Sequence, residues 1–366
     1  MADTSSFAVR GVRLRSNASV ATRRVRAPST IRHRPPIMAN VVAIATAGRR
    51  FRTGALFIGT ASRFGPFAMR FAYLGSAESW YVGDLRRAAG ARHRVDPVPF
   101  DGMHAGLGGA DWPESATANE PLGAFDAILI RAMGPGSLEQ VVFRMNVLGR
   151  YAGAGGVVVN PPRAVEAAVD KFLALAWLQD AGLLVPRTIV CQGVDDACRA
   201  FDVLGRDVVV KPIFGAEGRG IVRLSDPDLA ERAFRSLVQL QSVLYIQEYI
   251  EHCGRDYRLL VVGNRVFGML RENGADWRTN VSRGAVGKPL EVTSDLGGLA
   301  LRSARAIGAS LAGVDVVPAR DGRLFVIEVN ASPGWKGLAA ATGIDAARCV
   351  LDHLEESVND RRSPPD

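Results

Sequence analysis

The stretch that decides the fold lies near the C-terminal end of the chain and reads Phe325-Val326-Ile327-Glu328-Val329-Asn330-Ala331-Ser332-Pro333-Gly334. Its first six residues are typical of a strand, and the period of two in a strand places Glu328 and Asn330 on one face. An earlier strand is predicted at Val314-Asp315-Val316-Val317, and the turn Asp321-Gly322 folds the two strands antiparallel. Asp315 therefore lies beside Glu328 and Asn330.

These three side chains predict a metal site. Carboxylate and amide oxygens without His or Cys suit Mg²⁺ or Mn²⁺, which take their remaining ligands from water and phosphate. A solvated polar face is the alternative. Because both strands are otherwise strongly apolar, their carboxylates need a cation or an ionic partner, and we favour the metal site.

A glycine-rich segment lies upstream between two predicted strands. Lys211 ends the strand at 207–212, and Gly215, Gly218 and Gly220 follow before the strand at 221–224. The backbone N–H groups of such a hairpin can approach phosphate oxygens closely. The pattern is neither a P-loop nor a dinucleotide-binding fingerprint. Taken alone, it is as often an ordinary loop.

A third pattern is a buried strand at 243–250. Its last residues, Glu248 and Tyr249, can present backbone N–H and C=O groups to the edge of an adenine. Asp256 lies just beyond and can reach a ribose or a polar substrate group.

The remaining pattern predicts an α/β protein. Strands and helices alternate over 41–160, which indicates an open α/β sheet. Strands are expected there at 41–45, 55–59, 95–100, 125–131 and 157–160, and helices at 76–89 and 137–151, with a surface insertion at 104–121. After Pro162 we expect helices at 171–181 (capped by Asp170), 194–204, 227–240, 295–311 and 346–358. Further strands are expected at 186–190, and in hairpins at 257–263 with 265–271 and 314–319 with 323–330.

Composition narrows the class of protein. The 366 residues carry a net charge of +8, but residues 1–40 hold eight Arg and one acid, a net of +7, so the other 326 residues carry +1. No basic folded face interleaved with aromatics is left to bind nucleic acid. We expect residues 1–40 to be a disordered basic extension; a transit peptide or a start codon assigned too early are the alternatives. No apolar run is long enough to span a membrane.

Two residue counts add to this interpretation. The four cysteines have no regular spacing and are typical of reduced thiols in a cytoplasmic protein. Only four of the 45 basic residues are lysines, namely Lys171, Lys211, Lys288 and Lys336. A lysine carries a compact point charge, whereas an arginine carries a planar guanidinium. In a sequence that otherwise uses arginine, the presence of each lysine therefore needs an explanation.

Taken in order, these segments resemble the ATP-grasp superfamily, and within it the RimK-like α-L-glutamate ligases. The motifs that carry the resemblance are Asp170-Lys171, Val210-Lys211-Pro212 with Gly215–Gly220, Gln247-Glu248-Tyr249-Ile250, Asp256-Tyr257-Arg258, Arg278-Thr279-Asn280, Ala312-Gly313-Val314-Asp315 and Glu328-Val329-Asn330-Ala331-Ser332-Pro333-Gly334. The likeness covers roughly residues 160–356. It implies an N-terminal open α/β pre-ATP-grasp domain followed by a two-lobed ATP-grasp module.

The resemblance also implies domain boundaries. The pre-ATP-grasp domain would occupy 41–160, the small lobe with the glycine-rich loop 161–250, the large lobe with the metal site 251–358, and a disordered tail 359–366. It further implies a role for each site residue. Lys171, Lys211 and the three loop glycines would contact ATP phosphates, Glu248 and Tyr249 would hold adenine, and Asp256 would help to bind the nucleotide. Arg278, Thr279 and Asn280 would line the triphosphate, Asp315, Glu328 and Asn330 would hold two Mg²⁺ or Mn²⁺ ions, and Arg258, Arg278 and Arg283 would be catalytic.

The implied chemistry is ATP-dependent ligation of a carboxylate to the amine of an amino acid, typically glutamate, through an acyl phosphate. The acceptor would be a small cofactor, such as tetrahydromethanopterin, or a protein tail, such as the C-terminus of a ribosomal protein. Alternatives are an ATP-grasp ligase acting on amino-group carrier proteins or dipeptides, and a non-catalytic ATP-binding regulatory module. We also expect a cytoplasmic homo-oligomer without nucleic-acid or membrane partners.

Overall fold

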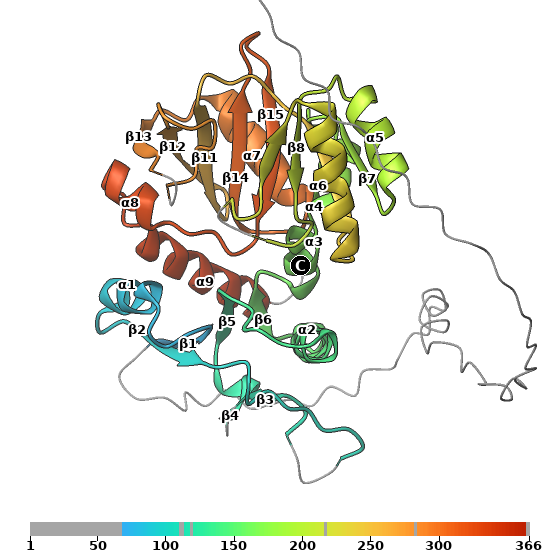
Figure 1. Cartoon of the computed structure of the whole chain (residues 1–366). Helices are drawn as coiled ribbons and strands as arrows, with labels where there is room; N and C mark the ends of the chain where they lie inside the picture. Colours follow the sequence, from blue (N-terminus) through green and yellow to red (C-terminus); the bar gives the residue numbers. More distant parts are fainter. Residues whose placement is uncertain (1–67, 110–112, 118–119, 216–217, 282–283, 364–366) are drawn as a thin grey trace, which may run out of the picture. The chain divides into compact units, whose positions relative to one another are not determined.

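The structure, a computed structural model, describes residues 68–109, 113–117, 120–215, 218–281 and 284–363. The basic extension and the strands predicted at 41–45 and 55–59 lie outside the described residues. Within these ranges the chain forms a four-stranded parallel sheet and two antiparallel sheets of four and five strands, with helices between and around them (Figure 1). The prediction of a mixed α/β fold is therefore confirmed.

The N-terminal sheet is parallel, with the order β2-β1-β5-β6. Its strands are β1 (Met69–Leu74), β2 (His93–Val98), β5 (Ala127–Ile130) and β6 (Val157–Val159), and its helices are α1 (Trp80–Ala89) and α2 (Leu138–Gly153). The insertion contains the short strands β3 (Ala116–Thr117) and β4 (Glu120–Pro121) and the 3₁₀ turn η1 (Leu122–Ala124). Ser137 and Gln140 form a capping box at α2. Ser79 caps α1, which begins at Trp80 and not at residue 76 as predicted.

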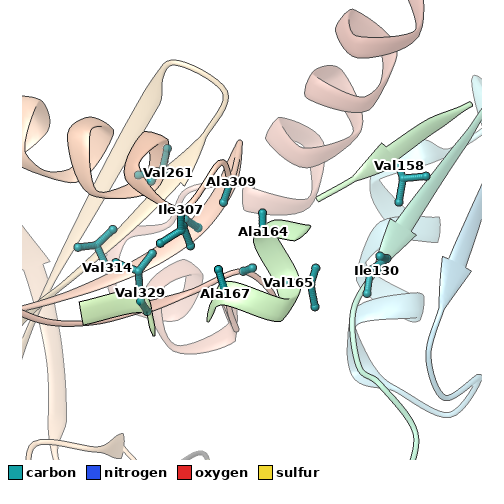
Figure 2. Close-up of a cluster of buried hydrophobic side chains, with 14 of the residues drawn as sticks. Ile130, Val158, Ala164, Val165, Ala167, Val261, Ile307, Ala309, Val314 and Val329 are labelled. Atoms are coloured by element: carbon teal, nitrogen blue, oxygen red, sulfur yellow. The ribbon is translucent and has the colours of Figure 1, made fainter. Parts of the chain in front are cut away.

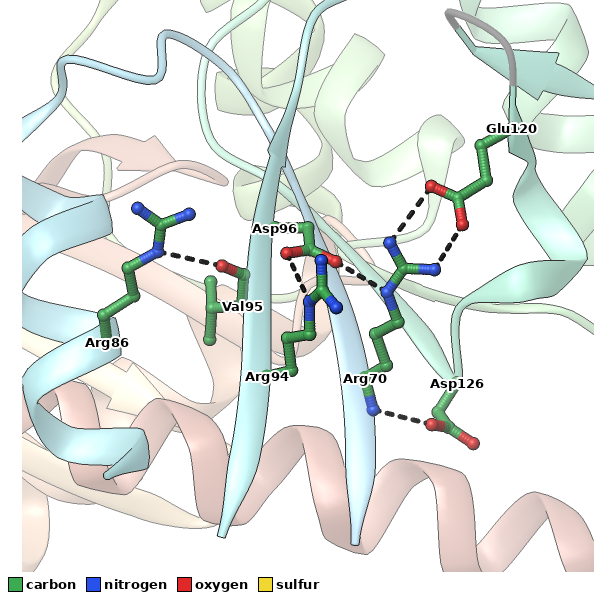
Figure 3. Close-up of polar contacts among 7 residues, drawn as sticks. All are labelled: Arg70, Arg86, Arg94, Val95, Asp96, Glu120 and Asp126. Atoms are coloured by element: carbon green, nitrogen blue, oxygen red, sulfur yellow. Dashed lines mark hydrogen bonds and ion pairs between the residues drawn. The ribbon is translucent and has the colours of Figure 1, made fainter. Parts of the chain in front are cut away.

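Hydrogen bonds and ion pairs of Arg70 link β1 to neighbouring segments. Arg70 on β1 donates to Asp96 on β2 and pairs with Glu120 of the insertion, and its backbone N–H donates to Asp126 (Figure 3). These contacts join β1, β2 and the start of β5. They explain how a strand that carries a charged residue at its second position is stabilised.

The small antiparallel sheet has the order β7-β10-β8-β9. Its strands are β7 (Thr188–Cys191), β8 (Val208–Lys211), β9 (Val222–Leu224) and β10 (Leu244–Glu248), and its helices are α5 (Val194–Val203) and α6 (Pro227–Gln239). Phe201 and Phe234 of these helices pack on Val208 and Val210. By the alternation of side chains along a strand, Lys211 projects from the opposite face of the sheet.

The large antiparallel sheet has the order β13-β12-β11-β14-β15. Its strands are β11 (Arg255–Val262), β12 (Arg265–Glu272), β13 (Val286–Leu290), β14 (Leu311–Pro318) and β15 (Leu324–Asn330). Helix α7 (Ser294–Ala306) packs on it and is shorter than predicted. Gly308 adopts a φ of 73° after the helix, and the apolar residues from Leu311 onward form β14 instead.

Four helices connect the sheets. They are α3 (Pro162–Val169), α4 (Lys171–Asp180), α8 (Lys336–Thr342) and α9 (Ala346–Arg362). Helix α9 lies between the N-terminal and the large sheet (Figure 1). It continues past residue 358, so the prediction of a disordered tail is wrong for 359–362. Helices α3 and α4 follow the predicted boundary at 161, and both pack on β15 of the large sheet.

A continuous apolar core joins the N-terminal and the large sheet. Ala164, Val165 and Ala167 of α3 lie between Ile130 and Val158 on one side and Val314 and Val329 on the other (Figure 2). All of these side chains are buried. The end of β15 is thus fixed with respect to the end of β5.

Two expectations from composition can be compared with the described residues. No helix in them is both long enough and apolar enough to cross a membrane. Their four cysteines, Cys191, Cys198, Cys253 and Cys349, are free thiols, as predicted.

Candidate active site

Asp315 and Glu328 lie opposite each other on β14 and β15, where a bulge follows Asp315. Asp315 is 6% exposed, and its carboxylate accepts from Arg258 Nη1 at 2.6 Å and pairs with Arg271 Nη2 at 3.1 Å. Burial alone would raise the pKa of Asp315, but the two guanidinium groups hold it below its usual value. Asp315 is therefore a buried anion.

Glu328 lacks so complete a set of partners. Burial, together with the charge of Asp315, raises the pKa of Glu328, and Lys171, Lys211 and Arg258 oppose this effect only in part. Two like carboxylates side by side in a buried sheet favour a cation near them.

Asn330 completes the predicted metal set. With its amide nitrogen toward Glu328, it donates to Glu328 Oε1 at 3.1 Å and accepts from Arg258 Nη1 at 3.2 Å. The opposite amide orientation places two oxygens side by side, which requires a cation between them. A pair of carboxylates with one amide suits a Mg²⁺ ion that keeps water and phosphate ligands. No cluster of three or more His, Cys, Asp or Glu side chains forms another metal site in the described ranges.

Arg271 is a site residue that sequence reasoning missed. It donates to both oxygens of Asp256 at 2.6 Å and also reaches Asp315. Thr279 donates to Asp256 at 2.5 Å. Asp256 is 2% exposed and both of its oxygens accept, so a nucleotide contact would have to displace one of these bonds. The predicted hairpin with its turn at Gly263-Asn264 pairs Asp256 with Arg271 across the two strands. The contact could therefore have been predicted from the register of that hairpin.

The two lysines assigned to phosphates lie in the small sheet and at the start of α4. Lys211 donates to Gln247 Oε1 at 2.6 Å, and burial lowers its pKa to about 8 although Glu328 and Asp315 oppose the shift. Lys171 donates to the carbonyl oxygen of Gly215 at 2.7 Å, so it reaches the glycine-rich loop. Asp170 caps α4 as predicted. The other lysines lie elsewhere, and Lys288 pairs with Glu272 on the large sheet.

The glycine-rich loop touches the large lobe. Gly218 has a φ of 70°, and a Cβ there would lie 2.5 Å from Asn280 Oδ1. The loop therefore lies against the predicted triphosphate segment. In that segment Arg278 is held by Asp276, to which its Nη2 donates at 2.7 Å. Arg283, predicted to be catalytic, lies outside the described residues.

Glu248 and Tyr249 line a cleft of about 510 Å³. The other residues that line it include Val185, Arg187, Ile250, Arg320, Arg323 and Phe325. The backbone N–H of Glu248 donates to Arg187 and that of Tyr249 donates to Asp207, and the Glu248 carboxylate binds Arg187. The expectation that these two N–H groups face adenine is therefore wrong. A purine edge would have to meet carbonyl groups instead.

A small antiparallel sheet that carries Lys211, a large antiparallel sheet that carries the paired carboxylates, and a glycine-rich loop that Lys171 reaches together form the arrangement of an ATP-grasp enzyme. The RimK-like ATP-grasp domain matches residues 168–354. The chain belongs to the RimK-like ATP-grasp family, and it is an ATP-dependent ligase that joins a carboxylate to an amine.

Named relatives agree with this family. The tetrahydromethanopterin:α-L-glutamate ligase of Methanosarcina acetivorans is 32% identical over 64% of this chain and 81% of its own length. A Pseudomonas putida protein named "Probable alpha-L-glutamate ligase" is 29% identical over 79% and 96%. Among solved structures, the ATP-grasp ligase PsnB with minimal precursor, Mg and ADP has a TM-score of 0.61 at 23% identity, over 79% of this chain and 98% of PsnB. This last likeness concerns the fold.

Proposed function

We propose that the protein couples the amine of L-glutamate to a carboxylate of an acceptor, with ATP as phosphoryl donor and two Mg²⁺ or Mn²⁺ ions. The observation that carries the proposal is the set of Asp315, Glu328 and Asn330 oxygens whose nearest cations include Lys211 and Arg258. The names of the relatives support glutamate as the incoming amino acid.

The reaction has two steps. An oxygen of the acceptor carboxylate attacks the γ-phosphorus of ATP, the bond to the β,γ-bridging oxygen breaks, and ADP and an acyl phosphate form. The glutamate amine then attacks the acyl carbon, phosphate leaves with the C–O bond electrons, and the amine loses a proton as the amide forms. Bound metal ions would neutralise charge on the phosphoryl oxygens.

The chain's own residues position these groups. Lys211 and Lys171 supply point charges for the phosphates, and the loop glycines let the backbone approach them. Arg258 holds Asp315 and Asn330 in place and carries positive charge beside them. Arg278 and Arg283 are the further candidates for the transferring phosphoryl group or a substrate carboxylate. Most of the catalytic effect would come from positioning and fixed charge.

The test is release of ADP that requires glutamate, acceptor and a divalent metal together. Lys211→Ala and Asp315→Asn should each lower turnover by about a hundredfold or more, because the first removes a positive charge at the phosphates and the second removes a charged metal ligand. Lys288→Ala is the matched control, since Lys288 pairs with Glu272 on the large sheet, and its turnover should equal the wild type. Unchanged turnover in both site variants would refute the site assignment.

The acceptor is identified by mass spectrometry with two classes of acceptor. One arm uses a reduced pterin that ends in carboxylates, and the other uses peptides that end in glutamate. We expect the mass of the acceptor to increase by one glutamate residue for each amide formed, with only one of the two classes of acceptor. ADP release without any gain in mass, in both arms, would instead favour another ATP-grasp ligase with a different acceptor, and no ADP release in either arm would favour the non-catalytic module.

A further inference from the structure

Five consecutive residues after Asn330 are each held by the N-terminal part of the chain. Asn160 donates to the carbonyl oxygen of Ala331 at 2.6 Å, and Ser332 donates to the carbonyl oxygen of Ile130 at 3.2 Å. Arg131 donates to the carbonyl oxygen of Pro333 at 2.7 Å. Tyr81 lies against Gly334, and Trp335 Nε1 donates to Asp84 at 2.9 Å. We call residues 331–335 the clamped segment.

Arg131 lies at the centre of these contacts. It directly follows β5 and is 6% exposed, with its guanidinium 4.4 Å from the Trp335 ring centroid and 4.8 Å from that of Tyr81. No acidic side chain pairs with it in the described part of the chain, and the groups that offset the burial of its charge are the hydroxyls of Tyr73 and Tyr81. A buried guanidinium without a carboxylate partner opposes folding, so stability alone does not account for an arginine here.

The clamped segment connects Arg131 to the candidate active site. Pro333 Cβ lies 2.9 Å from the position a Cβ would take on Gly313, and the Arg258 guanidinium lies within 2.6 Å of the same position. Pro333 and Arg258 therefore pack on the same glycine. Arg258 in turn binds Asp315 and faces Asn330. A shift of Pro333 would be transmitted to Asp315 and Asn330, two of the three predicted metal ligands.

We infer that Arg131 is a positioning residue for ligation: it holds the clamped segment so that Asn330 and Arg258 keep the geometry needed for phosphoryl transfer. The N-terminal domain thereby takes part in the chemistry without contacting the phosphates. The planar guanidinium suits this task because it lies against the Tyr81 and Trp335 rings, which pack edge to face with centroids 4.7 Å apart, and it donates in its own plane. The inference rests on the proposed function, because part of its test measures turnover in that reaction.

Arg131→Met tests the inference, because methionine keeps apolar contact with both rings and removes the buried charge. The carbonyl of Pro333 loses its donor, so we expect the melting temperature to fall by no more than about 5 °C. We expect kcat to fall about tenfold or more, and KM for ATP to change by less than about twofold, because only positioning is lost. Hydrogen exchange at the backbone amides of Ala331, Ser332, Gly334 and Trp335 should become faster.

Arg131→Lys is the second variant and keeps the charge. It should fold and show a lowered kcat. Arg70→Met is the matched control: Arg70 stacks on Phe125 and its ion pairs in Figure 3 lie within the N-terminal domain, so the substitution should lower the melting temperature and leave kcat unchanged. Wild-type kcat in Arg131→Met, or failure of both Arg131 variants to fold, overturns the inference.

Hydrogen exchange separates this inference from the proposed function. It is measured on the protein without substrates, so it is informative even if the wild type forms no amide with the acceptors offered. Faster exchange in the clamped segment of Arg131→Met, with other regions unchanged, supports the clamp. Exchange equal to that of the wild type refutes it.

Discussion

Lys211 shows how a single side chain can set the pH range of the enzyme. Burial lowers its pKa to about 8, whereas Glu328 and Asp315 partly restore it. The charged form is the one that binds phosphate, and it is present below the pKa. Lys211 is thus mostly charged at pH 7, but its pKa lies only about one pH unit higher.

We expect kcat/KM for ATP to fall as pH rises through about 8, by about tenfold per unit above that value, since the free enzyme loses the Lys211 proton there. A pH–rate profile measures this. In Lys211→Arg the basic limb should disappear, because arginine stays charged, although the rate at pH 7 should be lower. A basic limb that persists near pH 8 in Lys211→Arg would assign the titration to another group.

At the scale of elements, strand β14 approaches the clamped segment so closely that residue 313 must be small. A Cβ on Gly313 would lie 2.5 Å from Arg258 Nη2 and 2.9 Å from Pro333 Cβ. Gly313→Ala should therefore displace Arg258 and lower kcat about tenfold or more, with a loss of about 1–3 kcal/mol in unfolding free energy. Urea unfolding and steady-state kinetics measure the two effects.

Gly298→Ala is the matched control for that substitution. Gly298 lies within α7, and a Cβ there would meet no atom within 4 Å. Alanine should raise the unfolding free energy by about 0.5–1 kcal/mol, because it restricts the unfolded chain and favours the helix, and kcat should stay unchanged. Equal kinetics in both variants would show that residue 313 tolerates a methyl group.

Elements with a strong period were predictable from the sequence, and those defined by long-range contacts were not. The hairpin of β14 and β15 follows from alternation and one turn, so the proximity of Asp315 to Glu328 was predictable. Strand β1 was missed because Arg70 interrupts its apolar run, and the partners of Arg70 come from distant segments. Helix α3 was missed because it begins with proline and is eight residues long.

The same distinction applies to the candidate site. Motif residues such as Lys211 were found by type and spacing, whereas Arg131 lies outside every motif and acquires its contacts only in the folded chain. The strand at 125–131 was predicted, but no local pattern indicates that its last residue stacks on Trp335, 204 positions further on. Contacts of this kind depend on how whole domains pack.

At the scale of the whole molecule, Asn160 joins the N-terminal domain to the large sheet. Its side chain is fully buried and makes four hydrogen bonds, accepting from the backbone of Ser310 and Leu311 and donating to the carbonyls of Leu311 and Ala331. It connects the end of β6, the start of β14 and the first residue of the clamped segment. A buried amide with all four bonds satisfied is strongly specified.

Asn160→Ala should lower the unfolding free energy by about 3 kcal/mol or more, because it leaves backbone N–H and C=O groups buried without partners. It should also lower kcat, since Ala331 loses the donor that fixes the start of the clamped segment. Asn359→Ala, on the exposed side of α9, is the control and should change stability by less than about 0.5 kcal/mol. Urea unfolding followed by two probes, tryptophan fluorescence and far-UV circular dichroism, measures the effect. A loss below about 1 kcal/mol in Asn160→Ala would mean that the apolar core of α3, and not this amide, joins the N-terminal domain to the large sheet.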